Sequence, residues 1–444
     1  MGRNINNFKT LVAEWMLRDL KNVRKRDINI PTDINKIIAI IGPRRAGKTF
    51  LMYYTINRLL NNVPKKNILY INFEDERLKL LNAEDLTDLL TAFYEVAKPA
   101  QNKPMYLFLD EIQLVNGWDK WIRRIDESKQ FKIYISGSSS KLLSKELSTS
   151  LSGRSIDYLV MPFSFKESLV IENGQEVSYF EKIGYTEKKG FILNELREYL
   201  VNGGYPEVVL EKSKDVKLKI LRSYYDTIFY KDLAEHFSIK NIALLDAFLR
   251  NTLSTYSKYF SISKVYATLK NAGYKTSKKT LLNLLNYANQ VFFIFPINII
   301  SRSEKKRSIN PKKIYAVDTG IISAIKIENS IGKLMENCCF IELFRRKDTN
   351  NFEISYWKEY GTAEGREVDF VLYDQLKVIQ LIQVSYIERK EDINKREISA
   401  LVLASKELNC NNLLIITWDH ESEEKIEGKK IKFIPLWKWL MGVK

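Results

Sequence analysis

The stretch IIAIIGPRRAGKTF, residues 37–50, decides the fold of this chain. An apolar β-branched run leads into the pattern G-x-x-x-x-G-K-T, and the apolar residues after it continue as a helix. This order of strand, loop and helix predicts a phosphate-binding loop, in which backbone N–H groups and the positive end of the helix face a phosphate. We expect Lys48 to reach the β- and γ-phosphates and the Thr49 hydroxyl to bind Mg²⁺. The nucleotide-binding residues predicted by the pattern are Gly42, Pro43, Arg44, Arg45, Ala46, Gly47, Lys48, Thr49 and Phe50.

A second acidic motif follows this loop. The run LFLDE, residues 107–111, is an apolar strand that ends in two carboxylates. Either acid alone would be an ordinary strand-end carboxylate, but a phosphate-binding loop upstream favours a functional role. We expect Asp110 to hold the Mg²⁺ shell and Glu111 to polarise a water toward the γ-phosphate. Together the two motifs predict ATP and Mg²⁺ as cofactors and an ATPase activity.

Apolar strands alternate with helices in the first third of the chain. We predict strands at 36–41, 68–73, 105–109 and 132–135, after an amphipathic helix and a basic turn within residues 8–26. Strands that are apolar on both faces are typical of a buried parallel sheet. The fold class predicted here is therefore α/β, with a doubly wound parallel sheet.

Two further polar features follow the fourth strand. Ser136 and Ser138 are placed to contact the γ-phosphate or the water, or to cap a following helix, for which serine is equally suited. Arg154 is a candidate arginine finger that would stabilise transition-state charge, within the chain or from a neighbouring subunit. A surface salt bridge is the alternative role for this arginine.

Length and composition describe a chain of several domains. Its 444 residues predict two to four domains, and 45% hydrophobic with 28% charged residues is typical of a globular protein. No apolar run reaches the ~18 residues of a membrane span, and the first residues lack the apolar core of a signal peptide. We therefore expect a cytoplasmic location and no membrane partner.

Cysteine and histidine are scarce. Three cysteines, Cys338, Cys339 and Cys410, are too few for a disulfide framework or a four-thiolate zinc site. Two histidines exclude a histidine-rich metal site. We expect buried structural thiols, and chemistry carried by carboxylates, Lys, Arg, hydroxyls and a bound metal.

Positive charge is concentrated in one segment. The net charge is +16, and residues 258–313 hold twelve Lys or Arg against one acid, Glu304, a local net charge of +11. Such clustering is typical of a protein that binds an acidic polymer, with nucleic acid first. A solvated basic face has the same composition, so charge alone leaves both interpretations open.

The same segment has the pattern of a winged helix. A helix–turn–helix over 262–289 is followed by strands at 291–295 and 313–317, which flank a basic loop at 301–311. If the second helix enters a major groove, Leu281, Leu282 and Leu285 face the core, and the polar face presents Lys278, Lys279, Asn283, Asn286 and Tyr287. The wing would place Lys305, Lys306 and Arg307 on phosphates. A lid or assembly surface is the alternative role.

The chain resembles the archaeal-type P-loop ATPases of the AAA+ superfamily, in their signal-transduction-like branch. The matching stretches are GPRRAGKT (42–49), LDEIQ (109–113), SGSS (136–139), LSGR (151–154) leading into MPFSF (161–165), and NGGYPE (202–207). The resemblance spans almost the whole chain. It implies an N-terminal helix with the ATPase domain at 1–160, a helical lid at 161–240, a winged helix at 241–325 and a restriction-endonuclease-like domain at 326–444.

The implied nuclease-like domain departs from its pattern. In such folds a helical Glu, a strand Asp and then Glu-x-Lys gather Mg²⁺ beside the scissile phosphate. Glu336 and Asp369 match, whereas Gln383 and Ser385 stand where Glu and Lys are expected. The resemblance thus implies a degenerate metal site at Glu336, Asp369 and Gln383, for which Lys390 is a displaced lysine candidate. We expect weak cleavage or none.

Together these observations predict a Mg²⁺-dependent ATPase of the AAA+ type that is coupled to DNA binding. Two alternatives stay open: an ATP-coupled nuclease, and a signalling NTPase switch that acts on protein partners. Nucleotide and DNA are the expected partners, and a homo-oligomer is an open alternative to a monomer.

Overall fold

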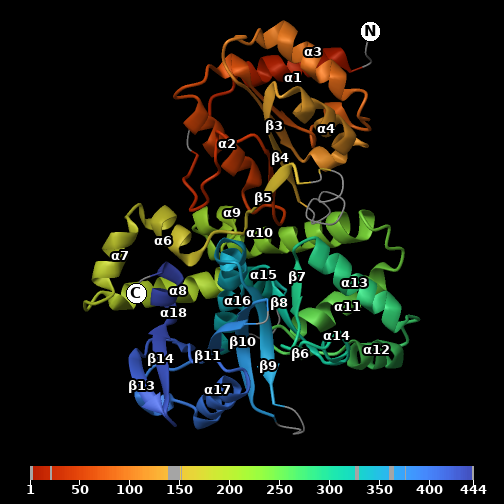
Figure 1. The fold of residues 1–444 in the computed structure, drawn as a ribbon. Coiled ribbons are helices and arrows are strands. Elements are labelled where there is room, and N and C mark those ends of the chain that lie inside the picture. Colours follow the sequence, from red (N-terminus) through yellow and green to blue (C-terminus); the bar gives the residue numbers. More distant parts are fainter. Residues whose placement is uncertain are drawn as a thin grey trace. The chain divides into compact units, whose positions relative to one another are not determined.

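The computed structural model describes residues 4–20, 23–138, 151, 153–325, 330–359, 365–375 and 377–442, without the side chain of residue 348. Two residues of the motifs quoted above, Ser139 and Ser152, lie outside the described residues. The chain forms two compact units, Met1–Met161 and Pro162–Lys444 (Figure 1). The finer division of the second unit into lid, winged helix and nuclease-like domain stays a prediction.

The first unit is built on a five-stranded parallel sheet. Its strands in spatial order are β2 (Ile68–Asn72), β3 (Met105–Asp110), β4 (Phe131–Gly137), β1 (Ile37–Ile41) and β5 (Ser155–Leu159). Its helices are α1 (Ile5–Leu17), α2 (Lys48–Leu59), α3 (Leu86–Ala97) and α4 (Trp118–Ser128) (Figure 1). The aliphatic residues of β1 to β4 are almost all buried, which confirms the predicted doubly wound parallel sheet.

Two parts of this unit differ from the prediction. The first helix begins at Ile5, three residues before the predicted segment 8–26, and it ends at Leu17. The edge strand β5 was not predicted, because its sequence SIDYL mixes polar and apolar residues and is only partly buried. An edge strand pairs on one side only, so its composition carries a weaker signal than that of a central strand.

The carboxyl ends of neighbouring strands bring the motifs together. β3, β4 and β1 are adjacent and parallel, so Asp110, Gly137 and Ile41 end at one edge of the sheet. The first residue of the loop must be glycine. Gly42 has φ +147°, and a Cβ there would lie 2.1 Å from the carbonyl oxygen of Val160. The chain that leaves β5 therefore passes too close to the loop for any side chain.

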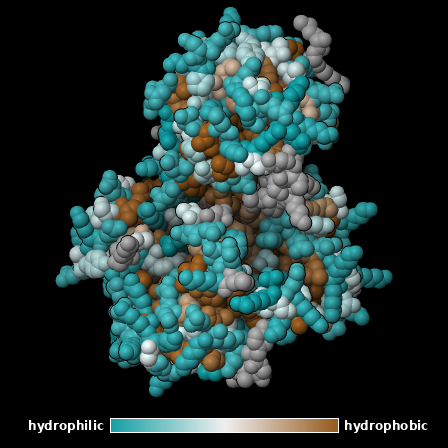
Figure 2. All heavy atoms as spheres, in the orientation of Figure 1, coloured by the Kyte–Doolittle hydropathy of each residue, from teal (hydrophilic) through white to brown (hydrophobic). Residues whose placement is uncertain are grey.

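The second unit combines a helical region with two sheets. Its helices are α6 (Phe165–Asn173), α7 (Val177–Ile183), α8 (Lys189–Asn202), α9 (Pro206–Leu210), α10 (Lys214–Thr227), the π-helix Ile228–Glu235, α11 (Ile242–Ser254), α12 (Ile262–Asn271), α13 (Lys278–Gln290), α14 (Glu304–Ile309), α15 (Thr319–Ala324), α16 (Ile331–Asn350), α17 (Lys395–Glu407) and α18 (Leu436–Met441). The visible face of both units is covered mainly by hydrophilic residues (Figure 2). No helix in the described ranges is long and apolar enough to cross a membrane.

The smaller sheet is antiparallel, in the order β6 (Tyr259–Phe260), β8 (Lys312–Ala316) and β7 (Ile294–Ile297). It follows helices α11 to α13, as expected for the 241–325 segment, with three differences. β7 begins three residues later than predicted, and the basic loop contains the short helix α14. On α13, Leu282 is exposed and Leu284 is buried in its place. The helix is therefore rotated slightly from the face that we predicted.

The larger sheet has six strands in the order β13 (Ser422–Ile426), β14 (Lys429–Pro435), β12 (Leu413–Thr417), β11 (Lys377–Val384), β10 (Glu367–Asp374) and β9 (Glu353–Lys358). The sequence pattern predicts strands at 352–358, 366–373, 376–384 and 413–417, and β9 to β12 agree with these bounds to within one residue. The elements β13, β14 and α18 were not predicted. The three cysteines are free and buried, as expected.

The NGGYPE stretch is held by a buried carboxylate. Asp318, at the start of α15, accepts hydrogen bonds from the N–H groups of Gly204 (2.7 Å) and Gly320 (2.8 Å). A Cβ on Gly204 would lie 2.1 Å from the carbonyl oxygen of Phe163. Burial raises the pKa of Asp318 to about 6, against the lowering effect of these N–H donors. The stretch therefore has a structural role in the second unit.

We expect Asp318→Ala to lower the free energy of unfolding by about 2–4 kcal/mol, because two buried N–H groups lose their acceptor. Urea denaturation followed by circular dichroism measures this change. Asp318→Asn keeps one acceptor oxygen and should lie between the variant and the wild type. Wild-type stability of Asp318→Ala would contradict the proposed role.

Candidate functional site

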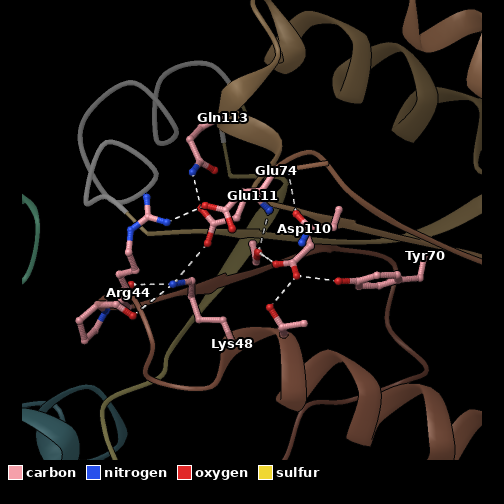
Figure 3. A network of polar contacts seen from close by, with 12 residues as sticks. Arg44, Lys48, Tyr70, Glu74, Asp110, Glu111 and Gln113 are labelled. Carbon is pink, nitrogen blue, oxygen red and sulfur yellow. Dashed lines mark hydrogen bonds and ion pairs between the residues drawn. The ribbon is translucent and has the colours of Figure 1, made fainter. Parts of the chain in front are cut away.

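Lys48 lies at the centre of the phosphate-binding loop (Figure 3). It is the first residue of α2, after Gly47 with φ +98°, and its side chain is buried. Its Nζ donates to the carbonyl oxygens of Gly42 and Pro43, both at 3.2 Å, and lies 3.5 Å from Glu111 Oε1. The ammonium is thus held by weak, exchangeable contacts inside the loop.

Asp110 is fully buried within a shell of hydroxyl groups. Thr49 Oγ1 (2.6 Å) and Tyr70 OH (2.8 Å) donate to its Oδ2, and Ser136 Oγ donates to its Oδ1. Burial, followed by the charge of Glu111, raises the pKa of Asp110, while the hydroxyl donors act in the opposite direction. The Thr49 hydroxyl and the Asp110 carboxylate are hard oxygen donors side by side, and this donor set suits Mg²⁺.

Glu111 has an unusual backbone and a different electrostatic environment. Its φ and ψ of 54° and 40° are left-handed, a costly conformation for a non-glycine residue that is common at functional sites. Its N–H donates to Ser136 Oγ (3.0 Å), and Gln113 Nε2 donates to its Oε2 (2.6 Å). Burial alone would raise the pKa of Glu111, but Lys48, Gln113 and Arg44 hold it below its usual value. This carboxylate is therefore ionised.

The other predicted residues of this site take several positions. Ser136 Oγ donates to Asp110 Oδ1 and accepts from the Glu111 N–H, and Ser138 forms a hydrogen bond with the Glu111 side chain. Arg44 pairs with Glu74 at 2.6 Å. Arg45 is exposed with φ 66°, and Phe50 is exposed on α2. Ala46 is buried in the loop.

Arg154 lies at the amino ends of the parallel strands, whereas the phosphate-binding loop lies at their carboxyl ends. Its carbonyl oxygen accepts from the N–H of Ile37 (2.9 Å), at the start of β1, and its guanidinium pairs with Glu127 (3.0 Å). The loop begins after Ile41, five strand residues and ~16 Å further along. Arg154 is thus at the end of the strands that is remote from a nucleotide in the loop of the same chain.

Sequence reasoning missed two residues that support the site. Arg26 is buried, and its Nη1 and Nη2 donate to the carbonyl oxygens of Ala46 (3.0 Å) and Met161 (2.8 Å). Tyr70 comes from an ordinary apolar strand and reaches Asp110. Neither has a local signal: Arg26 ends a basic run, and Tyr70 is one of many strand aromatics.

The residues predicted to contact DNA are mostly on the surface. Lys278, Lys279 and Asn283 are exposed on α13, and Lys305 and Lys306 are exposed on α14. Arg307 is half-buried, with its Nη1 on the Ser301 carbonyl oxygen (3.4 Å). Tyr287 stacks on Phe237 with ring centroids 4.0 Å apart, so one face of its ring is already covered.

The predicted residues of the C-terminal site do come together, around an unexpected lysine. Asp369 N–H donates to Gln383 Oε1 (3.3 Å). Lys313 Nζ lies 2.7 Å from Asp369 Oδ1 and 2.8 Å from Glu336 Oε1, with Glu367 at 3.5 Å. Lys313, which we counted in the basic surface segment, is 1% exposed. It does not contribute to that surface.

An ammonium group therefore lies between the carboxylates where a metal ion was expected. No group of three His, Cys, Asp or Glu residues in the described ranges could hold a metal ion. Burial by itself would lower the pKa of Lys313, but Asp369 and Glu336 raise it well above its usual value. Lys390, the displaced lysine that we considered, pairs with Glu424 (2.9 Å). The structure does not support a metal at Glu336, Asp369 and Gln383.

Comparisons with known proteins cover almost the whole chain. A family described as an AAA domain matches residues 34–169, and two families described as domains of unknown function match residues 193–330 and 331–439. An uncharacterized protein of Methanocaldococcus jannaschii is 37% identical, over 97% of this chain and 95% of its own length. One of Haemophilus influenzae is 28% identical, over 91% and 94%. Among solved structures, a Walker-type ATPase of Pyrococcus abyssi aligns over 72% of this chain and 95% of its own, with 14% identity and a TM-score of 0.43.

We expect Lys313→Met to lower the free energy of unfolding by about 3–5 kcal/mol, because buried carboxylates lose their counter-charge. Urea denaturation measures the loss. The loss should grow as the pH rises, because ionised carboxylates are then left unpaired in the folded state only. Lys395→Met, which removes an exposed lysine, should change stability by less than about 0.5 kcal/mol. Equal effects of the two substitutions would contradict this account.

Proposed function

Because the chain belongs to the archaeal-type P-loop ATPases of the AAA+ superfamily, we propose that it binds ATP with Mg²⁺, hydrolyses it, and couples hydrolysis to DNA binding. One observation carries the hydrolysis proposal. Two adjacent buried acids at the loop have different partners: Asp110 accepts from hydroxyl groups, whereas Glu111 lies 3.5 Å from the Lys48 ammonium. Their pKa values shift accordingly in opposite directions, Asp110 upward and Glu111 downward. Such divergence is typical of neighbouring acids with different roles.

The contacts of Lys48 suggest how nucleotide binding prepares the site. The loop carbonyl oxygens and Glu111 now share its ammonium. Phosphate oxygens are stronger partners, so an incoming phosphate would draw Lys48 away from Glu111. The pKa of Glu111 would then rise from its lowered value, because Lys48 is the charge that lowers it most. Glu111 would become a better base only when a phosphate is bound.

The metal would be held by Thr49 and Asp110. Bound Mg²⁺ would neutralise charge that develops on the phosphates. Tyr70 and Ser136 would keep the Asp110 carboxylate oriented toward the ion, because the Tyr70 hydroxyl donates to Oδ2 and the Ser136 hydroxyl donates to Oδ1. Thr49 would exchange its donation to Asp110 for a bond from its oxygen to the ion.

The DNA part of the proposal rests on exposed cations of α13 and α14. Lys278, Lys279, Lys305 and Lys306 are exposed in a segment with a single acid. Asn283 and the half-buried Arg307 belong to the same proposed surface. A nuclease role receives less support, because Lys313 lies between the carboxylates that cleavage would need.

We expect Glu111→Gln to lower the rate of ATP hydrolysis at least 100-fold while ATP still binds, because the variant cannot take up a proton. Steady-state phosphate release, with and without duplex DNA over a salt series, tests both parts of the proposal. DNA should stimulate the wild type, and the effect should fade as salt rises. Glu74→Gln, a control acid near the loop, should retain most of its activity.

Hydrolysis at the wild-type rate in Lys48→Ala or Glu111→Gln would contradict the ATPase proposal. A hydrolysis rate that DNA does not change, with no DNA binding even at low salt, would favour the switch that acts on protein partners. Metal-dependent DNA cleavage lost in Asp369→Ala would instead favour the nuclease.

We further expect Arg154 to act across an interface between copies of the chain, because its own loop lies at the far edge of the sheet. Arg154→Ala should lower hydrolysis at least about 100-fold with ATP affinity unchanged. Mixing inactive Arg154→Ala with inactive Glu111→Gln should restore activity, since each supplies what the other lacks. Wild-type rates in Arg154→Ala would leave this residue as a salt-bridge partner of Glu127.

A further inference from the structure

A cavity of about 500 Å³ in the second unit lies beside the basic helix α14. Its walls come from α13, β7, α14, β8, α16, β9 and β10. Exposed Asn289, Glu304, Ser308 and Glu353 lie among its lining residues. It is therefore open to solvent. The volume is within the range of small-ligand sites, which is roughly 300–1,000 Å³.

One wall of the cavity is aromatic. Phe344 of α16 is half-buried and packs on Phe295 of β7, with ring centroids 4.6 Å apart, and on Phe340, at 5.7 Å. Tyr373 of β10 is also half-buried among the lining residues. Rings supported from behind and partly open to a cavity are suited to stacking against a planar ligand.

Two cations, Lys312 and Arg307, are also among the lining residues of the cavity. Among the described residues, Lys312 Nζ donates to Asn298 Oδ1 (2.5 Å), and Arg307 Nη1 donates to the Ser301 carbonyl oxygen (3.4 Å). No ion pair joins either of them to a carboxylate of the described residues. Burial lowers the pKa of Lys312, so the ammonium lacks solvation that an anion would restore.

The acids of the cavity do not neutralise these two cations. Glu353 pairs with Lys347 at 2.8 Å. Glu304 is exposed at the beginning of α14, where solvent screens its charge. The cavity thus offers an aromatic wall, two available cations and the amide groups of Asn289 and Asn298.

From this combination we infer that the cavity binds a nucleoside phosphate, with the base on Phe344 and Tyr373 and the phosphate on Lys312 and Arg307. Base stacking needs the rings, the phosphate needs the cations, and the amides can bond base edges. The nucleoside phosphate is either a free nucleotide or an unpaired nucleotide of a nucleic acid strand. The second source rests on the proposed DNA contact; the first does not.

The test uses the full chain with Lys48→Ala, so that the phosphate-binding loop does not dominate nucleotide binding. Thymidine monophosphate is titrated by calorimetry. A fluorescein-labelled ten-nucleotide thymidine strand and a duplex are titrated by fluorescence anisotropy. Lys312→Met and Arg307→Gln remove charge, Phe344→Leu removes the ring, and Lys395→Met is a control that removes one exposed charge elsewhere.

Each of the three cavity variants should weaken binding of the single strand about tenfold, and Lys395→Met should change it less than about twofold. Parallel loss of thymidine monophosphate binding identifies a free nucleotide as a sufficient ligand. Loss confined to the oligonucleotide identifies a strand as the source. Both outcomes support the inference.

Three outcomes would overturn it: neither probe binds, the cavity variants bind both probes as before, or Lys395→Met is as harmful as they are. These results are distinguishable from failure of the proposed DNA coupling. If the cavity variants leave salt-dependent duplex binding and the binding of thymidine monophosphate and the single strand unchanged, the DNA proposal is kept and this one is removed. Nucleotide binding lost in the variants, without any DNA binding, would do the reverse.

Discussion

The buried carboxylate of Asp110 is the constraint on which the first unit depends. An anion removed from water needs donors on several sides, and here they come from three different elements: Thr49 of α2, Tyr70 of β2 and Ser136 of β4. These bonds fix the start of the helix and the carboxyl ends of three strands relative to one another. The phosphate-binding loop is thus set between elements that share one acceptor. Its geometry is a property of the sheet as a whole.

Adjacent acids in this site show how environment separates chemical roles. Asp110 faces neutral hydroxyl groups, and burial raises its pKa, so it gains most from a cation placed beside it. Glu111 is turned away by its left-handed backbone toward Lys48 and Gln113, which keep it ionised despite burial. The backbone conformation of one residue therefore sends two neighbouring side chains into opposite electrostatic surroundings.

Local sequence patterns predicted most of the strands and helices, but they did not predict contacts between residues that are far apart in the sequence. β1 and β3 of the first unit and β12 of the second have continuous apolar runs, so burial and sequence agree there. Lys313 shows the limit. In sequence it is one of twelve basic residues in its segment, yet it is buried against Asp369, fifty-six positions away. Arg26 escaped for the same reason, since its acceptors are backbone carbonyl groups with no side-chain signature.

The ion cluster at Lys313 also bears on modularity. Lys313 belongs to β8 and precedes residue 330, whereas Glu336 and Asp369 follow residue 330. The families matched at 193–330 and 331–439 thus divide the chain between a buried cation and its anions. A C-terminal fragment cut at that boundary would carry an uncompensated negative interior. Recombination at this position would have to keep β8 together with the larger sheet, because exchanging either segment alone would separate Lys313 from Glu336 and Asp369.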